Sequence, residues 1–177
     1  LPTTNAAERS SSSPPKPYGP VPTERQLRWH EMEFYGFLHF TVNTFTDKEW
    51  GYGDEPESVF NPTDFDANQI VKVAKDAGMK GLILTCKHHD GFCLWPTKYT
   101  DRNSMKMGPK KDILGDYFKA GRKEGLKVGL YYSLYEWYNP LWLSDKQRYV
   151  AEHMHPQFKD LVTKYKPDVI FSDGEWD

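Results

Sequence analysis

The chain has 177 residues, a formal net charge of −2, and Lys and Arg residues that are scattered rather than clustered. This charge pattern argues against nucleic acid or an anionic lipid surface as a partner. No apolar stretch approaches the roughly 20 residues that cross a bilayer, so no membrane span is expected, and the length suits one modest domain or part of a larger one.

The first 24 residues form a Ser- and Pro-rich segment. Four consecutive serines, 10–13, precede Pro14 and Pro15, and the segment has almost nothing to bury. This composition predicts a flexible segment over residues 1–24, with residues 25–177 as the folded part. A segment of this kind remains when a secretion signal or a lipid tether is removed. We therefore expect a secreted or periplasmic protein.

Four runs with strand character follow, and each is separated from the next by a helical pattern. The strands are predicted over residues 35–40, 81–87, 128–134 and 168–172, roughly 40 to 47 residues apart. This spacing is typical of βα units with long loops, so the strands are expected to be parallel.

Amphipathic helices are predicted between these strands. Asp66 caps the first, with Gln69 as its capping-box partner and Gly78 at its end. Asp112 opens the second, and Pro156 kinks or restarts the third. The predicted inward faces are Ile70, Val73, Ala74 and Ala77; Leu114, Tyr117 and Phe118; and Val150, Met154, Phe158, Leu161, Val162 and Tyr165.

The repetition of βα units fits either a doubly wound open sheet or a (β/α)8 barrel. An open sheet gathers its ligand contacts at one switch point, whereas here every predicted strand ends in polar or aromatic residues, and no Gly-rich phosphate loop follows any strand. These features favour an α/β fold of the (β/α)8 barrel type. Because four strands do not close a barrel, we expect the chain to be the amino-terminal half of one. The strand-end residues are His39; His88 and His89; Tyr132, Ser133, Glu136 and Trp137; and Asp173.

Two adjacent imidazoles, His88 and His89, follow the apolar run 81–86. A continued strand pleat would point them to opposite sides, which makes a shared metal awkward, and no metal-binding spacing occurs in the sequence. We expect no metal and no cofactor. With His39 and Lys87 the pair suits a polar floor that binds hydroxyl groups, although ordinary core histidines are the alternative.

Asp173 ends the last predicted strand, with Gly174 behind it and Trp176 nearby. A carboxylate in this place suits a nucleophile or an acid. A helix N-cap or loop carboxylate is the alternative, and Glu175 and Asp177 compete for the role.

Aromatic residues make up 15% of the chain. Trp and Tyr side chains at a cleft rim stack on the C–H faces of pyranose rings, so sugar is the expected ligand, although loop packing is the alternative for each Trp. The two cysteines, Cys86 and Cys93, are expected to be free thiols rather than a disulfide. The tryptophans in predicted loops are Trp50, Trp95, Trp137, Trp142 and Trp176.

Several motifs in one order resemble glycoside hydrolase family 29, the α-L-fucosidases, from about Trp29 to the end of the chain. Each motif is weak alone, and their shared order makes the match specific. They are residues 35–40 (YGFLHF), 48–50 (KEW), 87–92 (KHHDGF) with 95–96 (WP), 108–112 (GPKKD), 129–133 (GLYYS) with 136–137 (EW), and 166–168 (KPD) with 172–176 (SDGEW).

The resemblance implies a (β/α)8 catalytic domain, usually followed by a β-sandwich, and retaining hydrolysis of terminal α-L-fucose from a fucosylated oligosaccharide or glycoconjugate. Asp173 matches the family's nucleophile. The family's general acid/base lies later in its chains than residues 1–177, so this sequence does not contain it. The positions that match fucose-pocket residues are His39, Trp50, His88 and His89, with Glu49, Tyr132 and Trp176 as further candidates.

Other functions fit the same residues. A fucose-binding, non-catalytic barrel would use the same pocket, and so would a related glycosidase that acts on another sugar. The linkage preference is also open, because residues 134–177 resemble the broad-specificity branch that includes the animal lysosomal enzymes. Residues 39–51 resemble the branch selective for α1,3/α1,4-linked fucose.

Overall fold

The structure is a computed structural model that describes residues 13–174, and the chain divides into two units, one ending at Glu31 and one beginning at Met32. The sequence placed this boundary at residue 25. In the first unit, helix α1 (Glu24–His30) begins at Thr23, where a capping box joins Thr23 to Gln26. The Gln26 side chain accepts from the Thr23 N–H at 2.7 Å, so this short helix has its first backbone donors satisfied locally.

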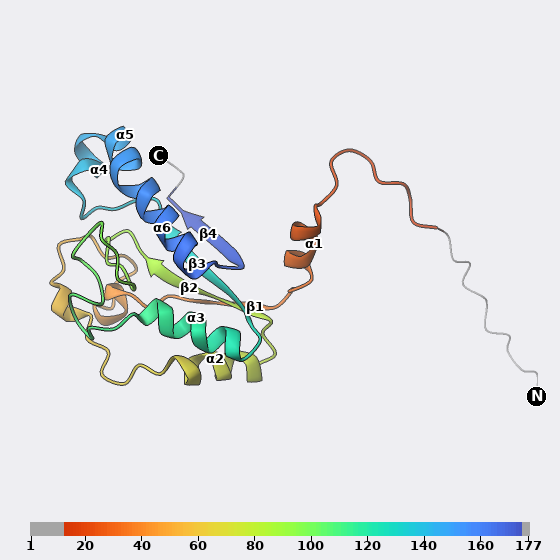
Figure 1. The fold of residues 1–177 in the computed structure, drawn as a ribbon, viewed down its shortest axis with the longest axis horizontal. Helices are drawn as coiled ribbons and strands as arrows, with labels where there is room; N and C mark the ends of the chain where they lie inside the picture. The colour runs from red at the N-terminus through yellow and green to blue at the C-terminus, as the bar shows by residue number, and fades with distance from the viewer. Residues whose placement is uncertain (1–12, 175–177) are drawn as a thin grey trace, which may run out of the picture. The chain divides into compact units, whose positions relative to one another are not determined.

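The second unit is built on a four-stranded parallel sheet in the order β1-β2-β3-β4 (Figure 1). The predicted parallel strands are confirmed, with ends that differ by at most two residues from those expected. The strands are β1 (Tyr35–Leu38), β2 (Gly81–Lys87), β3 (Lys127–Ser133) and β4 (Val169–Asp173).

Helices join each strand to the next and lie along one face of the sheet (Figure 1). Consecutive parallel strands with helices between them are the βα units of a (β/α)8 barrel, as predicted. The connecting elements are η1 (Val42–Phe45), η2 (Glu57–Val59) and α2 (Ala67–Asp76) after β1; α3 (Ile113–Lys123) after β2; and α4 (Pro140–Ser144), α5 (Lys146–Arg148), the π-helix η3 (Tyr149–Met154) and α6 (His155–Tyr165) after β3.

The inward face of α2 differs from the prediction. Val71 and Ala74 are buried, whereas Val73 is 57% exposed and Ala77 is the exposed C-cap. The buried stripe follows the i, i+3, i+4 spacing from Ala67, which leaves Val73 on the solvent side. Asp66 caps the helix by accepting from two backbone N–H groups, so the cap is one-sided rather than the predicted capping box.

The other two helices follow the sequence more closely. Asp112 caps α3 by accepting from the Gly115 N–H at 2.8 Å, and the predicted inward residues of α3 are buried. Before α6 the chain makes one π-helical segment, and Pro156 lies in the first turn of the new helix. Proline has no N–H to donate, so it fits a helix start, and the predicted restart at Pro156 is confirmed.

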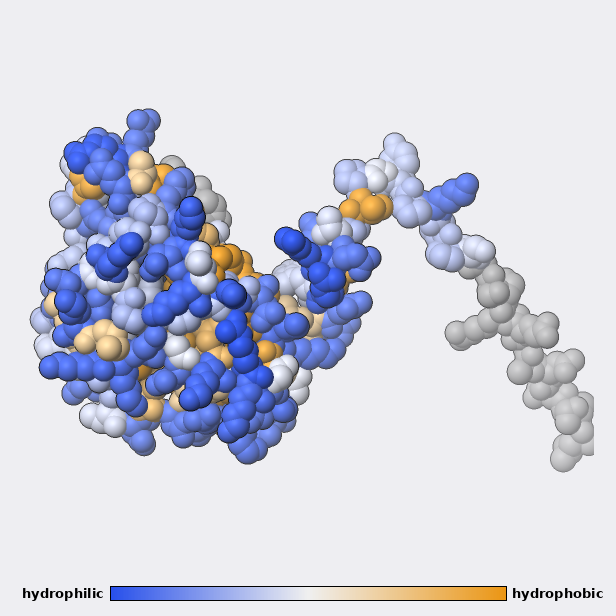
Figure 2. All heavy atoms as spheres, viewed as in Figure 1, coloured by the Kyte–Doolittle hydropathy of each residue, from blue (hydrophilic) through white to orange (hydrophobic). Residues whose placement is uncertain are grey.

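The main core lies between the sheet and these helices. Leu84, Val128 and Leu130 project from the strands into it and are fully buried, and a Cβ on Gly121 of α3 would overlap Val128, so helix and strand approach closely. The outer surface is largely hydrophilic in the view of Figure 2. Within residues 13–174, no helix has both the length and the apolar character that crossing a bilayer demands.

Asp112 also connects α3 to the end of α6, because the Tyr165 hydroxyl donates to its carboxylate at 2.8 Å. We expect Asp112→Ala to lower the free energy of unfolding by about 2 kcal/mol, since it removes a cap and a partly buried hydrogen bond. Asp112→Asn keeps one acceptor oxygen, which can still accept from the Gly115 N–H and the Tyr165 hydroxyl, and should cost under about 1 kcal/mol. Urea denaturation of the full-length protein measures both. Equal losses in the two variants would contradict the assignment.

Candidate active site

Polar side chains converge where the four strands end, and Asp173 of β4 lies among them. Its Oδ2 accepts a hydrogen bond from the Tyr131 hydroxyl at 2.5 Å and lies 3.9 Å from His89 Nε2. Its Oδ1 accepts from the Gly174 N–H at 2.8 Å. The side chain is 26% exposed. The carboxylate is therefore held by defined donors and still reaches solvent.

Three imidazoles form the neighbouring surface. The ring centroids of His88 and His89 are 4.3 Å apart, and those of His39 and His88 are 5.4 Å apart. The strand pleat that would have pointed the adjacent pair to opposite sides does not continue, because β2 ends at Lys87. Within residues 13–174, no three His, Cys, Asp or Glu side chains are grouped closely enough to hold a metal ion.

Burial keeps these rings neutral. Desolvation lowers the pKa of His88 to about 3, and the neighbouring imidazoles act in the same direction. Desolvation also lowers the pKa of His89, and the Asp173 carboxylate opposes this shift. His88 Nδ1 is buried and has no hydrogen-bond partner among residues 13–174. A neutral imidazole offers one donor and one acceptor, which suits hydroxyl groups.

Two of the predicted tryptophans lie beside these rings. Trp137 is 5.0 Å from His89 between ring centroids, and Trp50 is 6.3 Å from His89. Tyr52 stacks on Trp137 at 5.5 Å, which extends the aromatic edge. Trp95 and Trp142 are buried and do not reach it, and Trp176 lies outside the described residues.

Tyr132 does not join the cluster. Its ring faces α6, where its hydroxyl donates to Gln157 Oε1 at 2.6 Å. Tyr131, which the sequence analysis did not single out, takes the place beside Asp173. The alternation of the core residues Val128, Leu130 and Tyr132 was the signal for this, because it places Tyr131 on the opposite face.

Lys87 and Glu49, which the sequence also indicated as candidates, do not lie among the imidazoles. Lys87 is fully buried on the Tyr132 side, with its Nζ 4.3 Å from that ring centroid, so it is not part of a polar floor. Glu49 is exposed, and its backbone carbonyl accepts from the Asn43 side chain at 2.7 Å. Cys86 and Cys93 are both free and buried, as predicted.

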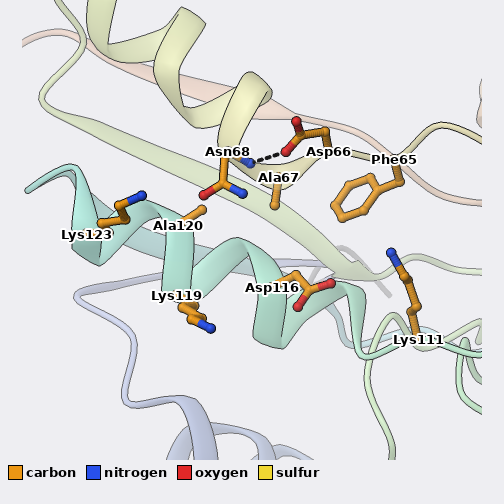
Figure 3. A pocket seen from close by; sticks show the side chains of 9 residues that line it. All are labelled: Phe65, Asp66, Ala67, Asn68, Lys111, Asp116, Lys119, Ala120 and Lys123. Atoms are coloured by element: carbon orange, nitrogen blue, oxygen red, sulfur yellow. Dashed lines mark hydrogen bonds between the residues drawn. The ribbon is translucent and has the colours of Figure 1, made fainter.

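A separate hollow lies between α2 and α3 on the helical side of the sheet (Figure 3). It contains none of the predicted site residues, and its charged side chains are three lysines and two aspartates. Its lining is Phe65, Asp66, Ala67, Asn68, Lys111, Asp116, Lys119, Ala120 and Lys123.

A family model described as Alpha-L-fucosidase matches residues 19–177. The chain belongs to the alpha-L-fucosidase family. It is 41% identical over 154 residues to Alpha-L-fucosidase 1 of Arabidopsis thaliana, an alignment that covers 85% of this chain and 30% of that protein. The chain thus spans about 30% of the length of this curated relative.

Solved structures agree. A glycoside hydrolase 29 family member from an unknown rumen bacterium has a TM-score of 0.83 and 42% identity, covering 92% of this chain and 29% of that chain. A GH29 alpha-L-fucosidase from Bacteroides thetaiotaomicron, solved as a trapped covalent intermediate with 2-fluoro-fucosyl fluoride, has a TM-score of 0.78 and 31% identity. It covers 92% of this chain and 44% of that chain.

In this member of the alpha-L-fucosidase family, a buried ion pair supports the site from behind. Lys87 Nζ lies 2.8 Å from Glu136 Oε2, and both side chains are at most 1% exposed. The same carboxylate oxygen lies 2.9 Å from His153 Nε2, and the Tyr149 hydroxyl donates to it at 3.4 Å. Burial alone would raise the pKa of Glu136, but Lys87 and His153 lower it to about 2.

We expect Lys87→Met to lower the free energy of unfolding by about 3 to 5 kcal/mol, because it leaves the Glu136 carboxylate buried without its cation. The double variant Lys87→Met/Glu136→Leu should recover most of this loss. Chemical denaturation of the full-length protein measures both, and a double variant no more stable than Lys87→Met would show that the uncompensated charge is not the cause.

Stability should also depend on pH through His88. Its folded pKa of about 3 lies below the unfolded value of 6.5, so the unfolded chain binds the extra proton as pH falls. The stabilisation is therefore present above pH 6.5 and lost towards pH 3, at up to about 1.4 kcal/mol per pH unit. His88→Gln should flatten the fall in stability between pH 6 and pH 4 by about 1 kcal/mol per unit. Burial raises the pKa of Asp90 to about 6, so protonation of this carboxyl favours the folded state as pH falls. This effect is the same in the wild type and in His88→Gln, so it does not alter the difference between them. Parallel stability curves for wild type and variant would refute the prediction.

Proposed function

We propose that the protein containing this chain is a retaining α-L-fucosidase, which hydrolyses terminal α-L-fucose from glycans with Asp173 as its nucleophile. The observation that carries the proposal is the place of the Asp173 carboxylate, bonded to Tyr131 at 2.5 Å and lying 3.9 Å from His89 Nε2. A nucleophile needs an oxygen fixed beside the sugar rather than a mobile loop carboxylate, and these contacts supply that fixation.

The chemistry follows the retaining pathway. An Asp173 oxygen attacks the anomeric carbon, the glycosidic C–O bond breaks, and the leaving oxygen is protonated by a general acid. Water then hydrolyses the fucosyl ester, with that same acid residue acting as base. The covalent intermediate of the Bacteroides thetaiotaomicron enzyme supports this course. We propose that the second carboxyl, which retaining enzymes place roughly 5 to 5.5 Å away, comes from a part of the protein later than residue 177.

The neighbouring side chains have distinct roles in this proposal. His39, His88 and His89 bond the sugar hydroxyls, because neutral imidazoles both donate and accept. Trp50 and Trp137 pack against an apolar face of the pyranose ring. Tyr131, rather than the pocket candidate Tyr132, lies at the site, and its hydroxyl bonds the nucleophile.

The remaining sequence-based expectations concern the whole protein. A carboxyl-terminal β-sandwich, export to the periplasm or the cell exterior, and the pocket roles of Glu49 and Trp176 stay predictions.

We expect Asp173→Gly in the full-length protein to lower turnover of an aryl α-L-fucoside by at least about 1,000-fold, because the covalent step loses its nucleophile. Azide should restore turnover by taking the vacated position and give a fucosyl azide, which mass spectrometry detects. Asp168→Asn, at the opposite end of β4, is the matched control and should keep activity. An Asp173→Gly protein that is active without azide would refute the nucleophile, and a wild type that binds fucose without turnover would favour the non-catalytic alternative.

A further inference from the structure

His89 makes different contacts through its two ring nitrogens. Nδ1 lies 2.5 Å from the Ser133 Oγ, and Nε2 lies 3.9 Å from Asp173 Oδ2. His89 is 2% exposed and Ser133 is fully buried, so bulk water does not compete for the contact between them. The register of the sheet places Ser133 directly beside Asp173, which puts both side chains on the same face at the same level.

The Ser133 hydroxyl determines which nitrogen carries the proton. A serine hydroxyl has one hydrogen to donate, and Ser133 donates it to the Tyr135 carbonyl oxygen at 3.0 Å. Its oxygen must then accept from His89, so Nδ1 carries the N–H. A neutral imidazole has one N–H, so Nε2 then bears the lone pair. Desolvation lowers the pKa of His89, in agreement with a neutral ring.

We propose that Ser133 is a positioning residue that holds His89 as its Nδ1–H tautomer and thereby presents Nε2 as a hydrogen-bond acceptor beside Asp173. The ligand group it accepts from is a hydroxyl, and the assignment of that hydroxyl to fucose rests on the proposed function. With the opposite tautomer, an Nε2–H would point towards the Asp173 carboxylate. That N–H would then compete with the sugar for the lone pairs of the Asp173 carboxylate.

The tautomer is directly measurable. In full-length protein labelled with ¹⁵N-histidine, two-bond ¹H–¹⁵N correlation spectra distinguish a protonated from an unprotonated ring nitrogen, and loss of a signal set in His89→Gln assigns the residue. We expect wild-type His89 to show a protonated Nδ1 and an unprotonated Nε2 at neutral pH. Ser133→Ala should move the proton to Nε2, and Ser133→Thr, which keeps the hydroxyl, should preserve the wild-type pattern.

Kinetics give a second readout. Ser133→Ala should lower kcat/KM for an aryl α-L-fucoside roughly tenfold through loss of one hydrogen bond, and Ser133→Thr should restore most of it. Ser104→Ala is the matched control, because Ser104 is equally buried and donates one bond to the Lys111 carbonyl at 2.6 Å. It should change neither the His89 signals nor kcat/KM beyond about twofold.

Two results would overturn the proposal: a wild-type spectrum with the proton on Nε2, or a Ser133→Ala spectrum unchanged from wild type. The wild-type spectrum decides even if Ser133→Ala does not fold. Because the spectrum needs no turnover, a wild-type protein without fucosidase activity would refute the proposed function while the tautomer was still tested.

Discussion

The buried ion pair between Lys87 and Glu136 is the constraint on which the site geometry depends. Lys87 is the last residue of β2 and Glu136 lies in the loop after β3, so the pair joins two strand ends next to the imidazoles of the candidate site. The next residues along the chain are His88 and Trp137, and the Trp137 N–H donates to the His89 carbonyl at 2.8 Å. A charge pair contributes little net stability when buried, yet it tolerates no loss of one partner. Its value here is that it fixes where two loops begin.

The π-helical segment belongs to the same arrangement. It supplies Tyr149 and His153, which are four residues apart, to the Glu136 carboxylate. Widened turns of this kind occur often near functional sites. The π-helical segment on the outside of the sheet is therefore connected to the residues at the strand ends through the Glu136 carboxylate. The side of the sheet that carries the candidate site and its covering layer are not independent.

Sequence patterns predicted most of the fold because strands and helix starts are local features. The largely apolar run of β2, the cap at Asp112 and the start of α6 at Pro156 each depend on a few adjacent residues. The errors arose where the outcome depends on which stripe of a helix packs against the sheet or on the residue at which a strand ends. Val73 faces solvent because Ala67 and Val71 take the inward stripe, and the two adjacent imidazoles share one side because β2 ends before them.

The site shows the same division between local and long-range information. Asp173 and the histidines follow from their places at strand ends, whereas the choice between Tyr131 and Tyr132 depends on which face of β3 meets the helices. The sequence marks Ser133 only as one of several strand-end residues. Its importance comes from the register with β4, which no local pattern reveals.

The face of the sheet opposite the helices has a practical consequence. Phe37 and Phe171 project from it, 40% and 48% exposed, and their rings are 5.2 Å apart. Expressed in isolation, residues 32–174 would expose this aromatic surface to water and to other copies of the fragment. Such a fragment should precipitate or require a solubilising fusion, and recombinant work should begin from the complete reading frame.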